Sequence, residues 1–80
     1  MKIYLLQQTE NSGYDTYDSI VVIANDELDA KSIHPLGGHI KDYDSYLGWA
    51  ENIDDITATE IGIASEDKKR GVVLTSFNAG

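Results

Sequence analysis

The chain has 80 residues, of which 14 are acidic and six are basic, so its formal net charge is −8. A negative charge of this size repels nucleic acid and anionic membrane surfaces and argues against direct binding to either. The chain contains no cysteine, which excludes disulfides and thiolate metal sites. No apolar run approaches the ~20 residues that span a membrane. We expect one domain, residues 1–80, with a thin core.

The N-terminal third of the chain predicts two paired strands. Residues 2–8 combine aliphatic and aromatic side chains without Gly or Pro, which is typical of a strand. Asn11-Ser12-Gly13 forms a turn signal, and residues 19–24 are a β-branched run that favours a second strand. We expect the two strands to form a hairpin with a long connection.

A short helix is predicted to follow. Asn25 can act as N-cap, and Asp26 and Glu27 lie where the helix dipole favours negative charge. Pro35 restricts the residue before it, so the helix should end near residue 33 or 34. A helix of two to three turns is marginal alone and must pack on the sheet.

The second half of the chain predicts a long connection and two more strands. Residues 36–53 have no regular pattern, and a connection of this length often carries function. Residues 56–64 alternate between two faces, residues 65–71 form a polar turn, and residues 72–77 form the last strand. The residues expected to be mostly buried are Ile20, Val22, Ile61, Ile63, Val73 and Phe77.

These elements predict an α+β fold in the order β-β-α-β-β. Two hairpins that flank one helix suggest a small antiparallel sheet of about four strands with the short helix on one face. The sequence leaves the order of the strands in the sheet open.

Candidate chemical sites each have a simpler explanation. His34 and His39 with Asp42 and Asp44 do not match a familiar metal-ligand spacing. The acid pairs Asp15/Asp18 and Asp54/Asp55 lack a neighbouring apolar pocket or charge that would tune them. The basic run 68–70 has no interleaved aromatic residues, so a solvated turn explains it. We therefore expect no catalytic site, metal or cofactor, and no enzymatic activity.

Aromatic residues interleaved with acids are the most distinctive pattern in the chain. Tyr and Trp beside charges are common in binding surfaces, where rigid rings bury area. The alternative is that these rings seal a thin core, and both explanations can hold for different residues. The predicted partner-binding residues are Tyr14, Asp15, Tyr17, Asp18, Asp42, Tyr43, Asp44, Tyr46 and Trp49.

Two segments carry a resemblance to known proteins. The first runs from Met1-Lys2-Ile3-Tyr4-Leu5-Leu6-Gln7-Gln8 through Gly13-Tyr14-Asp15-Thr16-Tyr17-Asp18-Ser19 to Ile33-His34-Pro35, and the second is Gly71-Val72-Val73-Leu74-Thr75-Ser76-Phe77-Asn78-Ala79-Gly80. With Trp49 between them, they resemble a family of small uncharacterised bacteriophage proteins. The resemblance implies phage origin and expression in the cytoplasm of an infected bacterium, and it implies no chemistry.

The size, charge and β-β-α-β-β order are also similar to those of several anti-CRISPR proteins, at the level of architecture alone. We therefore expect a phage-encoded interaction module that binds a host protein, plausibly a nucleic-acid-binding defence complex that it inhibits. The alternative is an accessory phage protein that self-associates as a homo-oligomer or binds a small ligand.

Overall fold

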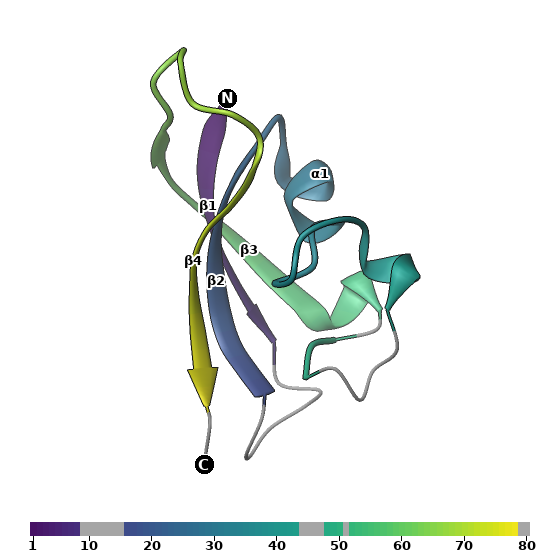
Figure 1. The fold of residues 1–80 in the computed structure, drawn as a ribbon. Helices are drawn as coiled ribbons and strands as arrows, with labels where there is room; N and C mark the ends of the chain where they lie inside the picture. The colour runs from purple at the N-terminus through teal and green to yellow at the C-terminus, as the bar shows by residue number, and fades with distance from the viewer. Residues whose placement is uncertain (9–15, 44–47, 51, 79–80) are drawn as a thin grey trace.

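The computed structural model describes residues 1–8, 16–43, 48–50 and 52–78 (Figure 1). It confirms the α+β class and the β-β-α-β-β order, with an antiparallel sheet and one short helix. In the described part of the long connection and at its end, the chain forms two short 3₁₀ turns. The elements are β1 (Lys2–Gln8), β2 (Thr16–Ala24), α1 (Glu27–Lys31), η1 (Ile40–Asp42), η3 (Ile53–Asp55), β3 (Ile56–Ile63) and β4 (Gly71–Asn78).

The strands lie in the order β3-β1-β2-β4, and all neighbours are antiparallel. The first predicted hairpin is confirmed, because β1 pairs with β2 from Lys2↔Ala24 to Gln7↔Ser19. The second predicted hairpin is wrong. β3 and β4 are the two edge strands of the sheet, with β1 and β2 between them, so residues 64–70 cross one end of the sheet instead of making a tight turn (Figure 1).

One face of the sheet carries the core. Figure 1 shows α1 and the long connection that follows it on the same side of the sheet. Cross-strand partners place Tyr4 opposite Val22 and Leu6 opposite Ile20, and all four are buried. The other buried residues in this cluster come from the ends of the strands, the helix and the connection: Ala24, Ala30, Ile33, Ile40, Trp49, Ala50 and Ile56.

Two of the six predicted core residues, Ile20 and Val22, are confirmed as buried. The other four were predicted wrongly, because Ile61, Ile63, Val73 and Phe77 are all exposed. Alternation along a strand divides side chains between two faces, but it does not show whether both faces are covered. The ring of Phe77 is only half covered, by a tilted contact with Tyr17 at a centroid distance of 4.7 Å.

The helix begins later and ends earlier than the sequence predicts. Asp26, not Asn25, is the N-cap, and its carboxylate accepts from the backbone N–H of Asp29 at 2.8 Å. Asn25 instead donates its backbone N–H to the Asp29 carboxylate at 3.0 Å. The helix has five residues and stops at Lys31, because the chain turns at Ser32 to form a compact loop. A helix this short depends on its caps and its packing.

The loop after the helix folds back on itself before it returns to the core. The backbone N–H of His34 donates to Gly38 O, and that of Gly37 donates to His34 O. Gly37 and Gly38 both have positive φ, at 92° and 76°, a conformation that side-chain-bearing residues rarely adopt. The loop thereby brings Ile33 and Ile40 into the core.

Because only one face of the sheet is covered, the same Leu→Ala substitution should destabilise the protein on the covered face and have little effect on the open side. Leu6 is fully buried, whereas Leu74 is 66% exposed. Leu6→Ala should lower the free energy of unfolding by about 2–5 kcal/mol, because it removes buried side-chain volume. Leu74→Ala should change it by no more than about 0.5 kcal/mol in the monomer. Urea unfolding of both variants at low protein concentration measures the difference, and equal losses would contradict the one-sided core.

Candidate functional site

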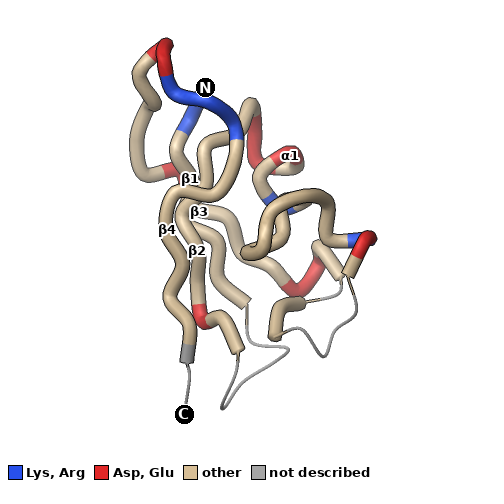
Figure 2. Tube along the Cα trace, in the orientation of Figure 1, with Lys and Arg blue, Asp and Glu red and all other residues tan. Residues whose placement is uncertain are grey.

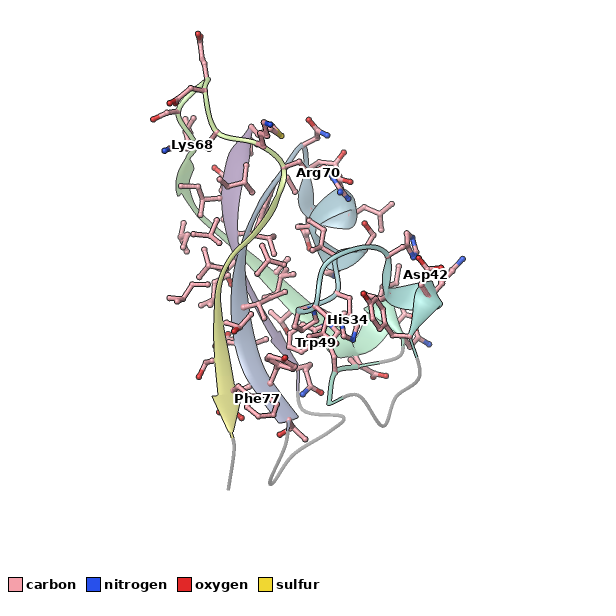
Figure 3. All side chains as sticks on the ribbon, viewed as in Figure 1. His34, Asp42, Trp49, Lys68, Arg70 and Phe77 are labelled. Atoms are coloured by element: carbon pink, nitrogen blue, oxygen red, sulfur yellow. The ribbon has the colours of Figure 1, made fainter. Side chains whose placement is uncertain are left out.

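The face of the sheet opposite the helix is a candidate interaction surface, which we call the open face. Its apolar side chains belong to all four strands, and cross-strand pairs such as Leu5↔Val21 and Val21↔Leu74 place them on one side. Figure 3 shows side chains projecting from this side, which bears no helix. The apolar residues of the open face are Ile3, Leu5, Val21, Ile23, Ile63, Val73 and Leu74.

Three of these side chains are more exposed than buried: Ile63 at 78%, Leu74 at 66% and Val73 at 57%. Ile61, next to the register shift in the pairing of β1 with β3, is also 54% exposed. Fully burying an aliphatic side chain contributes roughly 1.5–3 kcal/mol. Single exposed apolar residues are ordinary, but a contiguous group of them on one sheet face marks an interaction surface.

Uncharged polar residues continue the open face toward one end of the sheet. Gln7 pairs with both Ser19 and Thr57, and Ser19 in turn pairs with Ser76. Thr59 lies opposite Leu5. Among the described strand residues that we assign to this face, none carries a charge, although the net charge of the chain is −8.

A shallow hollow of about 380 Å³ lies at the other end of the open face. Ile3, Ile23, Ile63 and Val73 form its apolar lining, while Ser65 and Lys68 come from the crossing connection. Figure 2 shows the basic residues 68–70 as a blue stretch across this end of the sheet. The hollow can accept an apolar side chain, with a cation beside it.

The structure does not bring the predicted partner-binding residues that it describes together into one surface. Tyr14, Asp15, Asp44 and Tyr46 lie outside the described residues. Tyr17 and Asp18 were expected in a loop, but both belong to β2. Tyr17 is half-buried against the core, and its backbone N–H donates to Gly48 O at 2.8 Å, which joins β2 to the segment before Trp49.

Trp49 is 1% exposed and is part of the core. Its indole therefore cannot serve as an exposed anchor in this structure, which corrects its assignment as a partner-binding residue. The alternative explanation, in which loop aromatics seal a thin core, holds for Trp49. The physical reason is that the sheet supplies only one row of buried side chains per strand, so the connection must complete the core with its own large rings.

Tyr43 also has a structural role. Its ring stacks on His34, with centroids 3.7 Å apart and planes 15° apart, and its hydroxyl donates to Gly37 O at 2.7 Å. Asp42 precedes it in η1 and is exposed. In Figure 3 Asp42 lies on the helix side of the molecule, far from Phe77. Asp18 and Asp42 are both exposed, and in the described part of the chain neither makes an ion pair.

His34 is buried and its environment favours the neutral ring. The backbone N–H of Leu36 donates to His34 Nδ1 at 3.0 Å, so the neutral imidazole carries its proton on Nε2. Nε2 is buried and has no hydrogen-bond partner among the described residues. Burial lowers the pKa of His34. His39 instead lies in an exposed N-cap, where its Nδ1 accepts from the backbone N–H of Lys41.

Arg70 ties the crossing connection to the helix. Its guanidinium donates to both carboxylate oxygens of Asp29, at 2.8–3.0 Å, and to Ser32 Oγ at 3.3 Å. The hydrogen bond from Arg70 lowers the pKa of Asp29, and burial opposes it. Arg70 of the basic run therefore stabilises the fold. Lys68 and Lys69 make no ion pair within the described residues.

The described residues contain no group of three or more potential metal ligands among His, Cys, Asp and Glu. No helix among them is long and apolar enough to cross a membrane. Comparisons with known protein families, with curated proteins and with solved structures find no significant match to this chain.

Sequence reasoning missed the open face, although a signal for it was present. The strands alternate, yet they place apolar residues in both alternating positions, as in Ile3, Tyr4, Leu5 and Leu6. One predicted helix of two to three turns is too small to cover both sides of a four-stranded sheet. These two observations together would have indicated an uncovered apolar face.

The Asp29–Arg70 pair predicts a modest, pH-dependent contribution to stability. Arg70→Gln should lower the free energy of unfolding at pH 7 by about 1 kcal/mol, because the pair is bidentate but partly solvated. Because the pKa of Asp29 is lowered in the folded state, this contribution is present above the unfolded pKa near 4 and is lost as pH falls through the folded pKa. Urea unfolding from pH 7 to pH 2.5 measures it, with Lys69→Gln as the control. An Arg70→Gln effect no larger than the control's would contradict the role of the pair.

His34 predicts a second pH dependence in a separate range. Because its folded pKa lies below the unfolded value near 6.5, the unfolded chain binds the proton first as pH falls. Stability should therefore be complete above about pH 6.5 and decrease below it, by at most about 1.4 kcal/mol per pH unit. In His34→Asn, whose side-chain oxygen can replace Nδ1 as acceptor, the slope between pH 7 and 5 should diminish. His39→Gln should keep it, and an unchanged slope in His34→Asn would show that another group causes it.

Proposed function

We propose that this chain is a protein–protein interaction module that acts by docking the open face of its sheet onto another protein, without catalysis. The observation that carries the proposal is the group of exposed side chains Ile63, Val73 and Leu74 on a face whose described strand residues are uncharged. Apolar area of this kind gains free energy when a second protein covers it. The proposal keeps the interaction module predicted from the sequence and moves its main surface from the acidic loops to the sheet.

The resemblance to phage proteins supports a host protein as the target of this interaction. The protein then acts in the cytoplasm of an infected bacterium, on a nucleic-acid-binding defence complex. Two separate exposed carboxylates, Asp18 and Asp42, make no ion pair within the described residues and favour electrostatic attraction to such a target. Free carboxylates speed encounter with a basic surface.

A retention experiment tests the interaction function. A tagged copy is immobilised and exposed to untagged copies of the chain and, separately, to bacterial lysate. We expect it to retain protein in at least one arm, and Leu74→Glu should weaken binding of the purified partner by about 30-fold or more, as for a hot-spot residue. Leu36→Glu is the matched control, because Leu36 is 56% exposed but lies in the loop after the helix.

Three outcomes of this experiment are informative. Loss of retention in Leu74→Glu alone supports docking by the open face. Loss in the double variant Asp18→Asn/Asp42→Asn, with Leu74→Glu unaffected, would assign the interaction to the acidic surface instead. Retention by neither arm beyond that of a blank support would overturn the interaction function.

A further inference from the structure

We propose that the open face docks onto the open face of a second copy of this chain, forming a twofold-symmetric dimer of two packed sheets. The inference rests on the proposed function and names the partner of the same surface. Three properties of the face point to a second copy: its composition, its size and its position relative to the charges of the chain.

Composition is the first property. The apolar part of the face consists of aliphatic residues from all four strands, and its remainder consists of Ser, Thr and Gln. Two such faces pack as the halves of a β-sandwich, in which aliphatic side chains interdigitate between sheets about 10 Å apart. In a twofold contact the same surface patch of both copies forms the interface. A face of uncharged strand residues can pack against its own copy because no like charges meet.

Size is the second property. Strands of seven to nine residues are about 25 Å long, and four of them are about 19 Å wide, which gives a projected area of roughly 500 Å². The pleated accessible surface is larger than its projection. A stable interface buries at least roughly 600 Å² on each partner. The open face therefore reaches the lower range of stable dimers if nearly all of it is used.

Charge is the third property. Two copies that each carry a net charge of −8 repel one another unless their acids stay away from the contact. The described strand residues that we assign to the open face are uncharged, and the charged residue that lines its hollow is the cation Lys68. Glu60 in β3 is paired with Lys2, and Asp29 is paired with Arg70 beside the helix. These two paired acids therefore lie away from the contact.

The two sheets of the proposed dimer pack face to face and do not pair edge to edge. β4 is an edge strand that contains neither charge nor proline, so two copies could in principle pair along β4 instead. Pairing along β4 would leave Val73 and Leu74 uncovered, because their side chains stand perpendicular to the sheet. Face packing covers them, and it also closes the hollow between Ile3, Ile23 and Ile63.

Sedimentation equilibrium of the full chain tests the dimer. At loading concentrations from about 10 µM to 1 mM, which cover weak and moderate affinities, the mass should approach twice the 8.8 kDa of one chain. Leu74→Glu should weaken the dimer by about 100-fold or more, because symmetry introduces two charges into one apolar contact. Leu36→Glu should leave the dimer intact. Ile63→Glu is the second variant if circular dichroism shows that Leu74→Glu is unfolded.

Cross-linking separates face packing from edge pairing. The chain has no cysteine, so Leu5→Cys provides a single thiol near the centre of the open face, on β1. Face packing places the two thiols about 10 Å apart, within reach of a short bis-maleimide, whereas pairing along β4 separates the two β1 strands by five strand spacings, about 24 Å. Cross-linking of Leu5→Cys, with none in Leu36→Cys, is the expected result.

The outcomes distinguish the dimer from the proposed function. A single-chain mass at every concentration, a dimer that Leu74→Glu leaves unchanged, or a dimer without Leu5→Cys cross-linking would each overturn face-to-face docking. If the chain is monomeric but retains a lysate protein through Leu74, the dimer is wrong and the interaction function stands. If it is monomeric and retains nothing, both fail.

Discussion

The burial of one face of a four-stranded sheet is the interaction on which the rest of this structure depends. The central strands β1 and β2 supply the middle of the buried row, Leu6, Ile20 and Val22, and the edge strands β3 and β4 add less to it. A helix of five residues cannot cover that row alone, so the long connection completes the cover with Ile40, Trp49 and Ala50. All the large covering elements are thereby used on one side, and most of the opposite apolar row stays in contact with solvent, although Ile23 is buried.

Polar contacts hold the covering layer in place. The bidentate Arg70–Asp29 pair joins the crossing connection to the helix, and the stack of Tyr43 on His34 closes the loop that follows it. Each contact is modest in free energy, but a domain of this size has a small total stability. The two titrating groups involved, Asp29 and His34, respond to pH in different ranges, so their contributions can be measured separately.

The types of residue in the predicted site did not by themselves determine the roles of those residues. Pairing of acids with aromatics correctly indicated that some large rings lie outside the strands, but the same pattern suits a binding anchor and a core seal. Trp49 proved to be a core residue and Tyr43 a loop-closing one, whereas Asp18 and Asp42 are exposed. Whether a ring is a binding anchor or seals the core depends on the residues that surround it in the folded protein.

The sequence by itself determined the local structure, namely four strands and one short helix before Pro35, because propensity, alternation and capping act over a few residues. It also determined the charge. The tertiary structure decided that β3 and β4 are edges and that Leu6 is buried while Leu74 is exposed. Strand order and the choice of covered face depend on contacts between residues distant in the chain. A leucine in an alternating strand has the same local pattern whether a helix or solvent lies above it.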